Sequence, residues 1–375
     1  MRAGKWRVLL LLAFVLPALP SVKARAEGLP MTEELDFEEI QESVDEILEE
    51  EFRFRDAVMD LIQGEEIFTL EGFLTALLGQ FGENWKQEKQ ILLSILVLGI
   101  AAALLTNFSN IFQNQQIAQV SFEITYMLLF LILLQVFSGA QDLARSVLEE
   151  TQEFMRALIP AYFLAVTMSA GVSTAAAFYE FLLGLIYLIQ WLIGHGLMAL
   201  IQVHVMLVFI NHMTGEEYLS QMSEMSAKAV GWILKSLLAV VVGFNAVQGI
   251  IHPAIDSLKG GIFSRAAELI PGIGNAAGAV TDTILGSAVL IKNGIGAAGL
   301  IVIVLLCMAP LLKLGTLVLI LELAAAIIQP VSDKRMVGCV AGVGDGIKLL
   351  FRVVFTVAVL FMLTIVVVAV SVGGT

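Results

Sequence analysis

The chain has 375 residues, of which 58% are hydrophobic and only 15% carry a charge. This composition excludes a soluble globular protein, because a soluble core of this size could not bury so much apolar surface. The formal net charge of −13 argues against a nucleic-acid-binding protein, whose surface needs Lys and Arg to neutralise phosphates. Most of the acid lies early, since residues 27–90 hold 19 acidic against 4 basic residues.

Residues 1–26 have the pattern of an export signal peptide. Arg2, Lys5 and Arg7 precede the apolar stretch 8–19, and residues 24–26 read Ala-Arg-Ala, which suits a cleavage site. An apolar stretch of this length rises only about 18 Å as a helix, which is short for a membrane span. We therefore expect cleavage after Ala26, with an uncleaved anchor as the alternative. The following residues are then expected on the non-cytoplasmic side, because the basic n-region stays in the cytoplasm.

Residues 27–90 are predicted to form a small acidic helical ectodomain. Apolar residues recur there at steps of mostly three or four, which places them on one helix face: Phe37, Ile40, Val44, Ile47, Leu48, Phe52, Val58, Met59 and Ile62. A second amphipathic stretch follows Gly64 and either lies on the membrane surface or folds back on the first. Two interpretations remain open: an acidic hairpin that packs only on itself, or a docking surface for a basic partner.

Residues 91–375 form the predicted polytopic membrane domain. Five apolar runs are long enough to span the bilayer as helices: 91–108, 120–138, 157–177, 232–250 and 349–372. Two longer runs, 178–211 and 295–329, are each a single helix or a pair, because Gly194-His195-Gly196 and Pro310 offer breaks. The fold class is therefore an all-α helical membrane protein with about seven to nine spans. Later cations favour cytoplasmic loops: Lys259, Arg265, Lys292, Lys334, Arg335, Lys348 and Arg352.

The segment 251–299 is rich in Gly and Ala and has no continuous apolar run. Small residues four apart, at Gly274 and Gly278 and at Gly294 and Ala298, allow helices to approach closely. Alternatively, the irregular Gly and Pro backbone lines a water-filled pore at membrane depth. The candidate helix-packing or pore residues are Gly274, Gly278, Gly294, Gly296 and Gly299.

The sequence indicates no catalytic, cofactor-binding or metal site. Residues 294–299 match the G-x-G-x-x-G dinucleotide pattern, but the helix expected after them is wholly apolar and contains Pro310, which contradicts a dinucleotide-binding fold. No P-loop occurs, so a partner must supply energy for any transport. The histidines lack metal-ligand spacing. Two cysteines give no disulfide framework, with Cys307 in an apolar span and Cys339 expected in a late loop.

Four ionisable residues inside apolar runs are candidate intramembrane polar sites: Glu180, His195, Lys313 and Glu322. Glu180 and His195 share a helix stripe with Tyr187, Trp191 and Gln202, for which structural hydrogen bonding is favoured over a proton relay. Lys313 and Glu322 are nine residues apart, so they lie on opposite faces of one straight helix and cannot pair there.

Several segments resemble the stage III sporulation protein AE family of endospore-forming bacteria. The resemblance rests on HPAIDSLKGG at 252–261, the Gly-rich stretch 268–300, the Pro310-Leu311-Leu312-Lys313 segment and IIQPVSDKR at 327–335. It implies a subunit of the sporulation channel complex in the mother-cell membrane around the forespore, needed for late forespore gene expression. The implied partners are a secretion-type ATPase and ring-forming subunits. We also expect contacts with lipid and with further copies of the chain, but not with nucleic acid.

Three functions compete. A non-enzymatic channel or export subunit is favoured by the resemblance and by the missing nucleotide motif. An ion-coupled secondary transporter or permease would require essential intramembrane acids such as Glu180 or Glu322. An intramembrane enzyme would need clustered His, Asp or Glu at ligand spacing, which the sequence does not show.

Overall fold

The fold is a bundle of long helices, seen here in a computed structural model that describes residues 37–47, 52–64, 70–111, 115–170, 172–214, 218–267 and 274–371. The predicted signal segment 1–26 lies outside these residues. No strand occurs in the described ranges. The helices are α2 (Glu38–Ile47), α3 (Phe54–Gln63), α4 (Leu70–Ile111), α5 (Gln115–Ala170), α6 (Val172–Leu192), the π-helical turn η2 (Ile193–Leu197), α7 (Met198–Thr214), α8 (Ser220–Ala267), α9 (Gly274–Ile328) and α10 (Lys334–Ser371).

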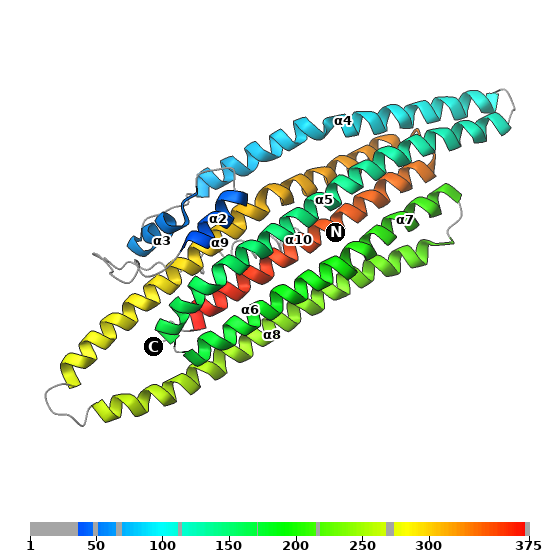
Figure 1. Cartoon of the computed structure of the whole chain (residues 1–375). Helices are drawn as coiled ribbons and strands as arrows, with labels where there is room; N and C mark the ends of the chain where they lie inside the picture. The colour runs from blue at the N-terminus through cyan, green and yellow to red at the C-terminus, as the bar shows by residue number, and fades with distance from the viewer. Residues whose placement is uncertain are drawn as a thin grey trace.

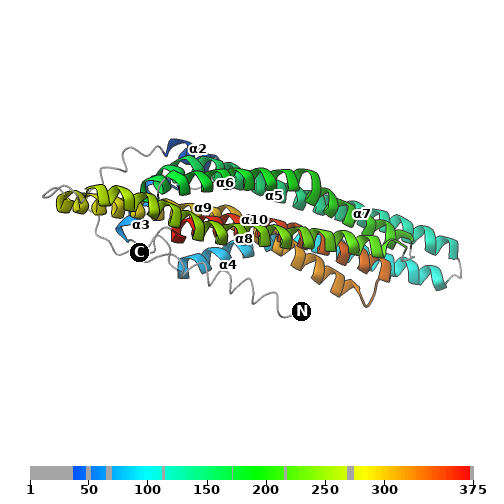
Figure 2. The ribbon, with the colours of Figure 1, turned by 90° about the horizontal axis from the view of Figure 1, so that it is seen from below.

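The long helices lie side by side along one axis, with α9 and α10 at the centre (Figures 1 and 2). Helix α9 packs against α10, α5 and α4, and α10 packs also against α5, α7 and α8. Helices α4 and α8 lie at the periphery and turn many large apolar side chains outward, among them Val97, Trp232 and Val240. This is the arrangement expected where lipid, and not water, surrounds the bundle.

Six helices in the described residues are long and apolar enough to cross a membrane, where the sequence predicted seven to nine spans. The difference arises mainly in α5, which joins the predicted span 120–138 and residues 157–170 of the predicted span 157–177 into one helix, while the end of that span belongs to α6. Its 56 residues are about 84 Å long, well beyond the ~30 Å hydrocarbon core.

The middle of α5 explains why the helix does not break between its two apolar stretches. Asp142, Arg145, Glu149, Glu153 and Arg156 form an exposed charged face, while residues such as Val147, Leu148 and Met155 on the opposite face are buried. The stretch is therefore amphipathic and keeps its contact with the bundle. Exposed charges are costly in hydrocarbon, so we place this stretch outside it.

The two long apolar runs are single helical rods. Gly194-His195-Gly196 forms the wide π-helical turn between α6 and α7 without a break in the chain direction. Helix α9 continues through Pro310. Since each run is continuous, the paired-helix alternative does not occur at either place.

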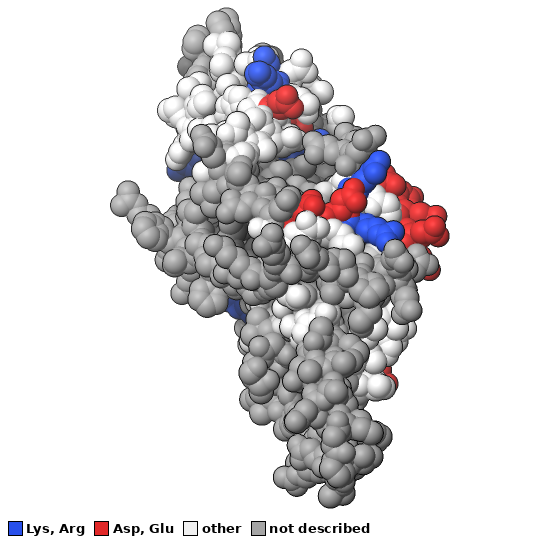
Figure 3. Space-filling model, turned by 90° about the vertical axis from the view of Figure 1, so that its left-hand side faces the viewer, with Lys and Arg blue, Asp and Glu red and all other residues white. Residues whose placement is uncertain are grey.

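The acidic N-terminal helices α2 and α3 pack on the membrane helices more than on each other. Helix α2 contacts α5 and helix α3 contacts α9. The ring of Phe54 meets that of Phe154 of α5 edge-on, with centroids 6.5 Å apart. Five acidic side chains of α2 remain exposed: Glu38, Glu39, Glu42, Asp45 and Glu46. Acidic side chains gather at one edge in Figure 3, which views the molecule from the left-hand side of Figure 1.

Two local features hold the N-terminal helices in place. The Gln41 side chain donates to the Phe52 carbonyl at 2.9 Å and accepts from the Phe54 amide at 2.8 Å, which fixes the first half of α2 against the start of α3. Gly64 ends α3 in the left-handed conformation with a φ of 77°, where glycine avoids a steric penalty. The second amphipathic stretch forms no separate helix, because α4 runs from Leu70 through the first predicted span and across the predicted domain boundary at residue 90.

The turn between α9 and α10 contains part of the IIQPVSDKR segment. Asp333 caps α10, accepting a hydrogen bond from the Arg335 amide at 2.9 Å and from the Arg335 guanidinium at 3.1 Å. Partial burial acts to raise the pKa of Asp333, but these hydrogen bonds and the charge of Arg335 outweigh it and lower the pKa. The guanidinium also lies 3.6 Å above the ring centroid of Phe122, which joins this turn to the start of α5.

Helix α10 approaches α7 along three glycines spaced four residues apart, Gly338, Gly342 and Gly346. A Cβ atom at these positions would overlap the side chains of His212, Val208 and Val205, respectively. The glycines therefore set the distance between the two helices, as small residues do in membrane bundles. The sequence carries this spacing, but the glycines predicted to lie at helix contacts were those of α9 alone.

We predict that Gly342→Ala lowers the thermal unfolding midpoint of the purified protein in detergent. The added methyl group meets Val208, whose β-branched side chain is stiff in a helix, so the overlap costs about 1–3 kcal/mol. Gly139→Ala in α5 is the matched control, because nothing lies within 4 Å of its added Cβ. Equal midpoints for the two variants would contradict the glycine contact.

Candidate functional site

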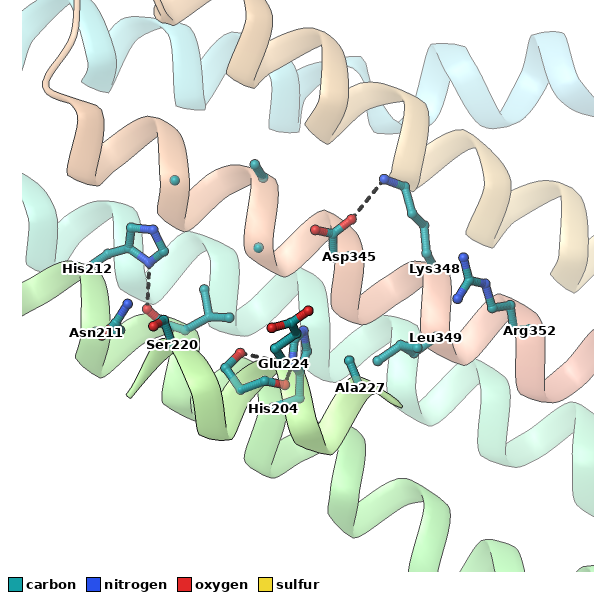
Figure 4. Close-up of a pocket in the computed structure, with 15 residues that line it drawn as sticks. His204, Asn211, His212, Ser220, Glu224, Ala227, Asp345, Lys348, Leu349 and Arg352 are labelled. Atoms are coloured by element: carbon teal, nitrogen blue, oxygen red, sulfur yellow. Dashed lines mark hydrogen bonds and ion pairs between the residues drawn. The ribbon is translucent and has the colours of Figure 1, made fainter. Parts of the chain in front are cut away.

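A polar cleft between α7, α8 and α10 is the candidate functional site. Its volume is about 440 Å³, and its polar lining includes His204, Asn211, His212, Glu224, Asp345, Lys348 and Arg352. Figure 4 shows His212 and Asn211 toward one end, His204 and Glu224 in the middle, and Lys348 and Arg352 toward the other. Helices α8 and α10, and the continuous rod formed by α6 and α7, are apolar enough to cross a membrane, and ionisable groups inside such bundles mark functional sites by default.

His204 connects α7 to α8 at the wall of this cleft. The side chain is only 6% exposed. Its Nδ1 lies 2.9 Å from the Ser223 carbonyl oxygen and 3.0 Å from the Ser223 hydroxyl. Ser226 donates to the same carbonyl at 2.8 Å. The other ring nitrogen of His204, Nε2, is buried and has no hydrogen-bond partner among the described residues.

Lys348 connects α10 to α9 at the opposite wall. Its ammonium group contacts Glu322 of α9 at 2.6 Å and Asp345 of its own helix at 2.9 Å. Two carboxylates thus share one ammonium group, which leaves this triad one negative charge in excess. Arg352, one helical turn further along α10, lines the same cleft and places a positive charge on its wall.

The four predicted intramembrane polar residues do not form one site. Lys313 approaches Glu88 of α4 at 3.8 Å, whereas Glu322 pairs with Lys348, so each finds its partner on a different neighbouring helix. Glu180 and His195 are exposed on the outside of the bundle, as are Tyr187, Trp191 and Gln202 of the predicted stripe. Only Glu322 therefore reaches the cleft, through Lys348.

Three of the predicted glycines lie at helix contacts within the chain. A Cβ at Gly294 would come 2.9 Å from Ile62 of α3, and one at Gly299 would come 2.9 Å from Leu158 of α5. At Gly296 it would lie 3.1 Å from the Tyr162 hydroxyl. Gly274 and Gly278 belong to the first turns of α9, but their surroundings lie outside what the structure describes. The dinucleotide-like segment 294–299 is the interior of a helix and not the strand-to-helix turn that such sites need.

Both cysteines are buried thiols. Cys339 lies inside α10, which corrects the expectation of a late loop, because α10 begins at Lys334. Cys307 lies 3.7 Å from the Thr151 hydroxyl of α5. Within the described ranges, no group of His, Cys, Asp and Glu is arranged to hold a metal ion.

Lys292 is a buried cation, although its charge suggested a place in one of the later loops. It lies inside α9 with a fully buried side chain, and its ammonium group donates to the carbonyl of Ala369 at 2.9 Å. Ala369 belongs to the last turn of α10, where carbonyls lack partners within the helix and the dipole favours a cation. A lone lysine in an apolar, Gly-rich run was the available signal for this contact.

We predict that Lys292→Met speeds hydrogen exchange in the last turn of α10. Methionine keeps a similar length but leaves the partly buried Ala369 carbonyl without its donor, which costs about 1 kcal/mol. Lys235→Met is the matched control, since Lys235 is an exposed lysine of α8. Unchanged exchange at residues 368–371 in the Lys292 variant would show that the lysine does not hold this end.

Comparison with known proteins identifies the family. The family model described as "Stage III sporulation protein AE" matches residues 52–372, which spans every helix from α3 to α10. The chain belongs to the stage III sporulation protein AE family. A protein named "Stage III sporulation protein AE" from Bacillus subtilis (strain 168) is 26% identical over 317 residues, covering 83% of this chain and 78% of that protein. No solved structure matches.

Family membership confirms the resemblance found in the sequence and gives the chain a role in sporulation. The matched region contains the cleft, the glycine contacts of α9 and α10, and the capped turn at Asp333. Together with six helices apolar enough to span a membrane, it makes the chain a sporulation protein of helical membrane type.

Proposed function

We propose that the chain is a non-enzymatic membrane subunit of the channel or export complex that links the mother cell to the forespore and sustains late forespore gene expression. The observation that carries the proposal is family membership over a bundle of long apolar helices. A polar cleft within that bundle is a feature that a passage through a membrane requires. A secretion-type ATPase among its partners would supply the energy, since the sequence has no P-loop.

The complex is the first object to test. We expect the detergent-solubilised protein, purified from sporulating cells, to have a mass well above the 40.5 kDa of one chain and to bring the ATPase and other sporulation subunits with it. Deleting the gene should abolish late forespore transcription and leave the ATPase without its membrane attachment. Normal late transcription in the deletion strain, or a purified single chain without partners, would refute the proposal.

We further propose that the protein resides in the mother-cell membrane around the forespore, with its N-terminal helices on the non-cytoplasmic side. The basic start of the chain and the exposed acidic face of α2 support this side.

Glu46→Cys, at an exposed position of α2, should react with an impermeant thiol reagent while mother cells are intact and the space between the membranes is reachable. The unmodified chain gives the background, because both native cysteines are buried. Labelling only after lysis of the mother cell would place the N-terminal helices in the cytoplasm.

An ion-coupled transporter is the second candidate, and the charged cleft is the observation that favours it. The acids it would use are Asp345 and Glu322 near Lys348, since Glu180 faces outward. Transport of a solute by the purified chain alone in liposomes would favour this function over the channel subunit.

A further inference from the structure

The outer face of the rod formed by α6 and α7 carries a stripe of exposed polar and aromatic side chains. Tyr187 is 70% exposed and Trp191 is 53% exposed, and His195 and Gln202 are exposed as well. The rings of Trp191 and His195 stack on each other, with centroids 6.3 Å apart. We call these four residues the polar stripe.

The polar stripe cannot lie wholly outside the hydrocarbon of the membrane. The apolar rod Ala175–Met213 has 39 residues and is about 58 Å long. The part before Tyr187 is only about 18 Å long, and the part after Gln202 only about 16 Å. Neither part reaches the ~30 Å of a hydrocarbon core, so wherever the rod crosses the bilayer, the core includes some of the stripe. Polar groups at that depth need a protein partner, because lipid tails offer no hydrogen bonds.

A shallow groove on α7 continues the stripe. Its volume is about 310 Å³, and it is lined by Ala199, Gln202, Val203, Met206, Leu207 and Ile210. These positions recur at steps of mostly three and four, as on a helix face that receives the side chains of a second helix. The small side chain of Ala199 lets another backbone come close.

Stripe and groove form one face of the rod. With the π-helical turn counted as one extra residue, Trp191 and Tyr187 each lie within about 20° of Ala199 at 100° per residue. His204, which lines the polar cleft, lies about 140° away from Ala199 around α7. The face is therefore distinct from the cleft.

The chemistry of this face fits a second copy of the same chain. From Phe181 to Thr214 the sequence has no Asp, Glu, Lys or Arg, so two identical faces meet without like-charge repulsion. The Gln202 amide has both donors and an acceptor, so it can pair with the same amide of another copy. Glu180 is about 33 Å from Gln202 along the rod, and helices that cross at the groove have diverged at that distance.

We propose that the outer face of the α6–α7 rod is a dimer interface, in which the α7 groove of one copy receives α7 of a second copy. Copies inserted in the same direction are related by a two-fold axis along the membrane normal, so their α7 helices run parallel. Gln202 of each copy then faces Gln202 of the other. The proposal goes beyond the proposed function and does not depend on it.

Disulfide crosslinking of the full chain in lipid bilayers tests this interface. Ala199→Cys places a thiol in the groove, and we expect oxidation to join two copies into a species of about twice 40.5 kDa. Val97→Cys is the matched control, because Val97 is a 65% exposed apolar residue on α4, away from the groove. The unmodified chain gives the background, since both native cysteines are buried.

Three further variants measure the strength of the dimer by energy transfer between labelled chains at varied protein-to-lipid ratios. Gln202→Leu should weaken dimerisation about tenfold, the effect of one lost hydrogen bond between model membrane helices. Ala199→Phe should weaken it as well, because the ring fills the groove. Val97→Phe, outside the groove, should leave it unchanged.

No crosslink at Ala199→Cys, a crosslink no stronger than at Val97→Cys, or dimerisation unchanged in both Gln202→Leu and Ala199→Phe would overturn the proposal. So would a photo-crosslinker at position 199 that joins only another protein, or only lipid, in membranes of sporulating cells. These outcomes leave the channel proposal standing, because bound subunits and late forespore transcription test that proposal separately.

Discussion

Polar groups inside an apolar bundle must find hydrogen-bond partners, and the groups that find them on a neighbouring helix organise the structure. The Lys292 ammonium group bonds the carbonyl end of α10, and the Tyr126 hydroxyl donates to the Phe209 carbonyl of α7 at 2.8 Å. The Tyr162 hydroxyl reaches the Ile365 carbonyl at 3.3 Å. Unpaired groups would each be costly away from water, so every such bond selects which helices are neighbours and in what register. Apolar contacts alone select far less, since lipid is equally apolar.

The second requirement is that helices approach closely. Helix α10 meets this requirement and also provides polar partners to its neighbours. Its glycines at 338, 342 and 346 bring its backbone near α7, while its carbonyl end receives Lys292 and its Lys348 reaches α9. The same helix thus forms one wall of the cleft and the centre of the bundle. The wall of the cleft that α10 forms has little freedom to move, because the helix is fixed at both ends. Changes at the cleft are therefore expected in its side chains and not in the position of α10.

The sequence predicted much of the fold but little of the cleft. Apolar run length identified the membrane helices, because hydropathy and helix length are local properties. The join within α5 was missed, since its charged face at Asp142 to Arg156 looked like a loop while its buried face continued the helix. Glu322 was found but not its partner, because Lys348 is distant in sequence and adjacent only after packing. His204 had no distinctive spacing, and its importance rests on Ser223 of another helix.

The π-helical turn at Ile193–Leu197 changes how the α6–α7 rod must be read. Before the turn, Leu182, Ile186 and Ile189 are buried, and after it Ile201, Val205 and Val208 are buried. At about 100° per residue the second set is displaced by roughly one residue's rotation from the first. The turn therefore behaves as a single inserted residue that the helix has absorbed as a bulge. A homologue lacking one residue here would have a plain α-helix with the same buried faces, so a gap at this point in an alignment is compatible with an unchanged bundle.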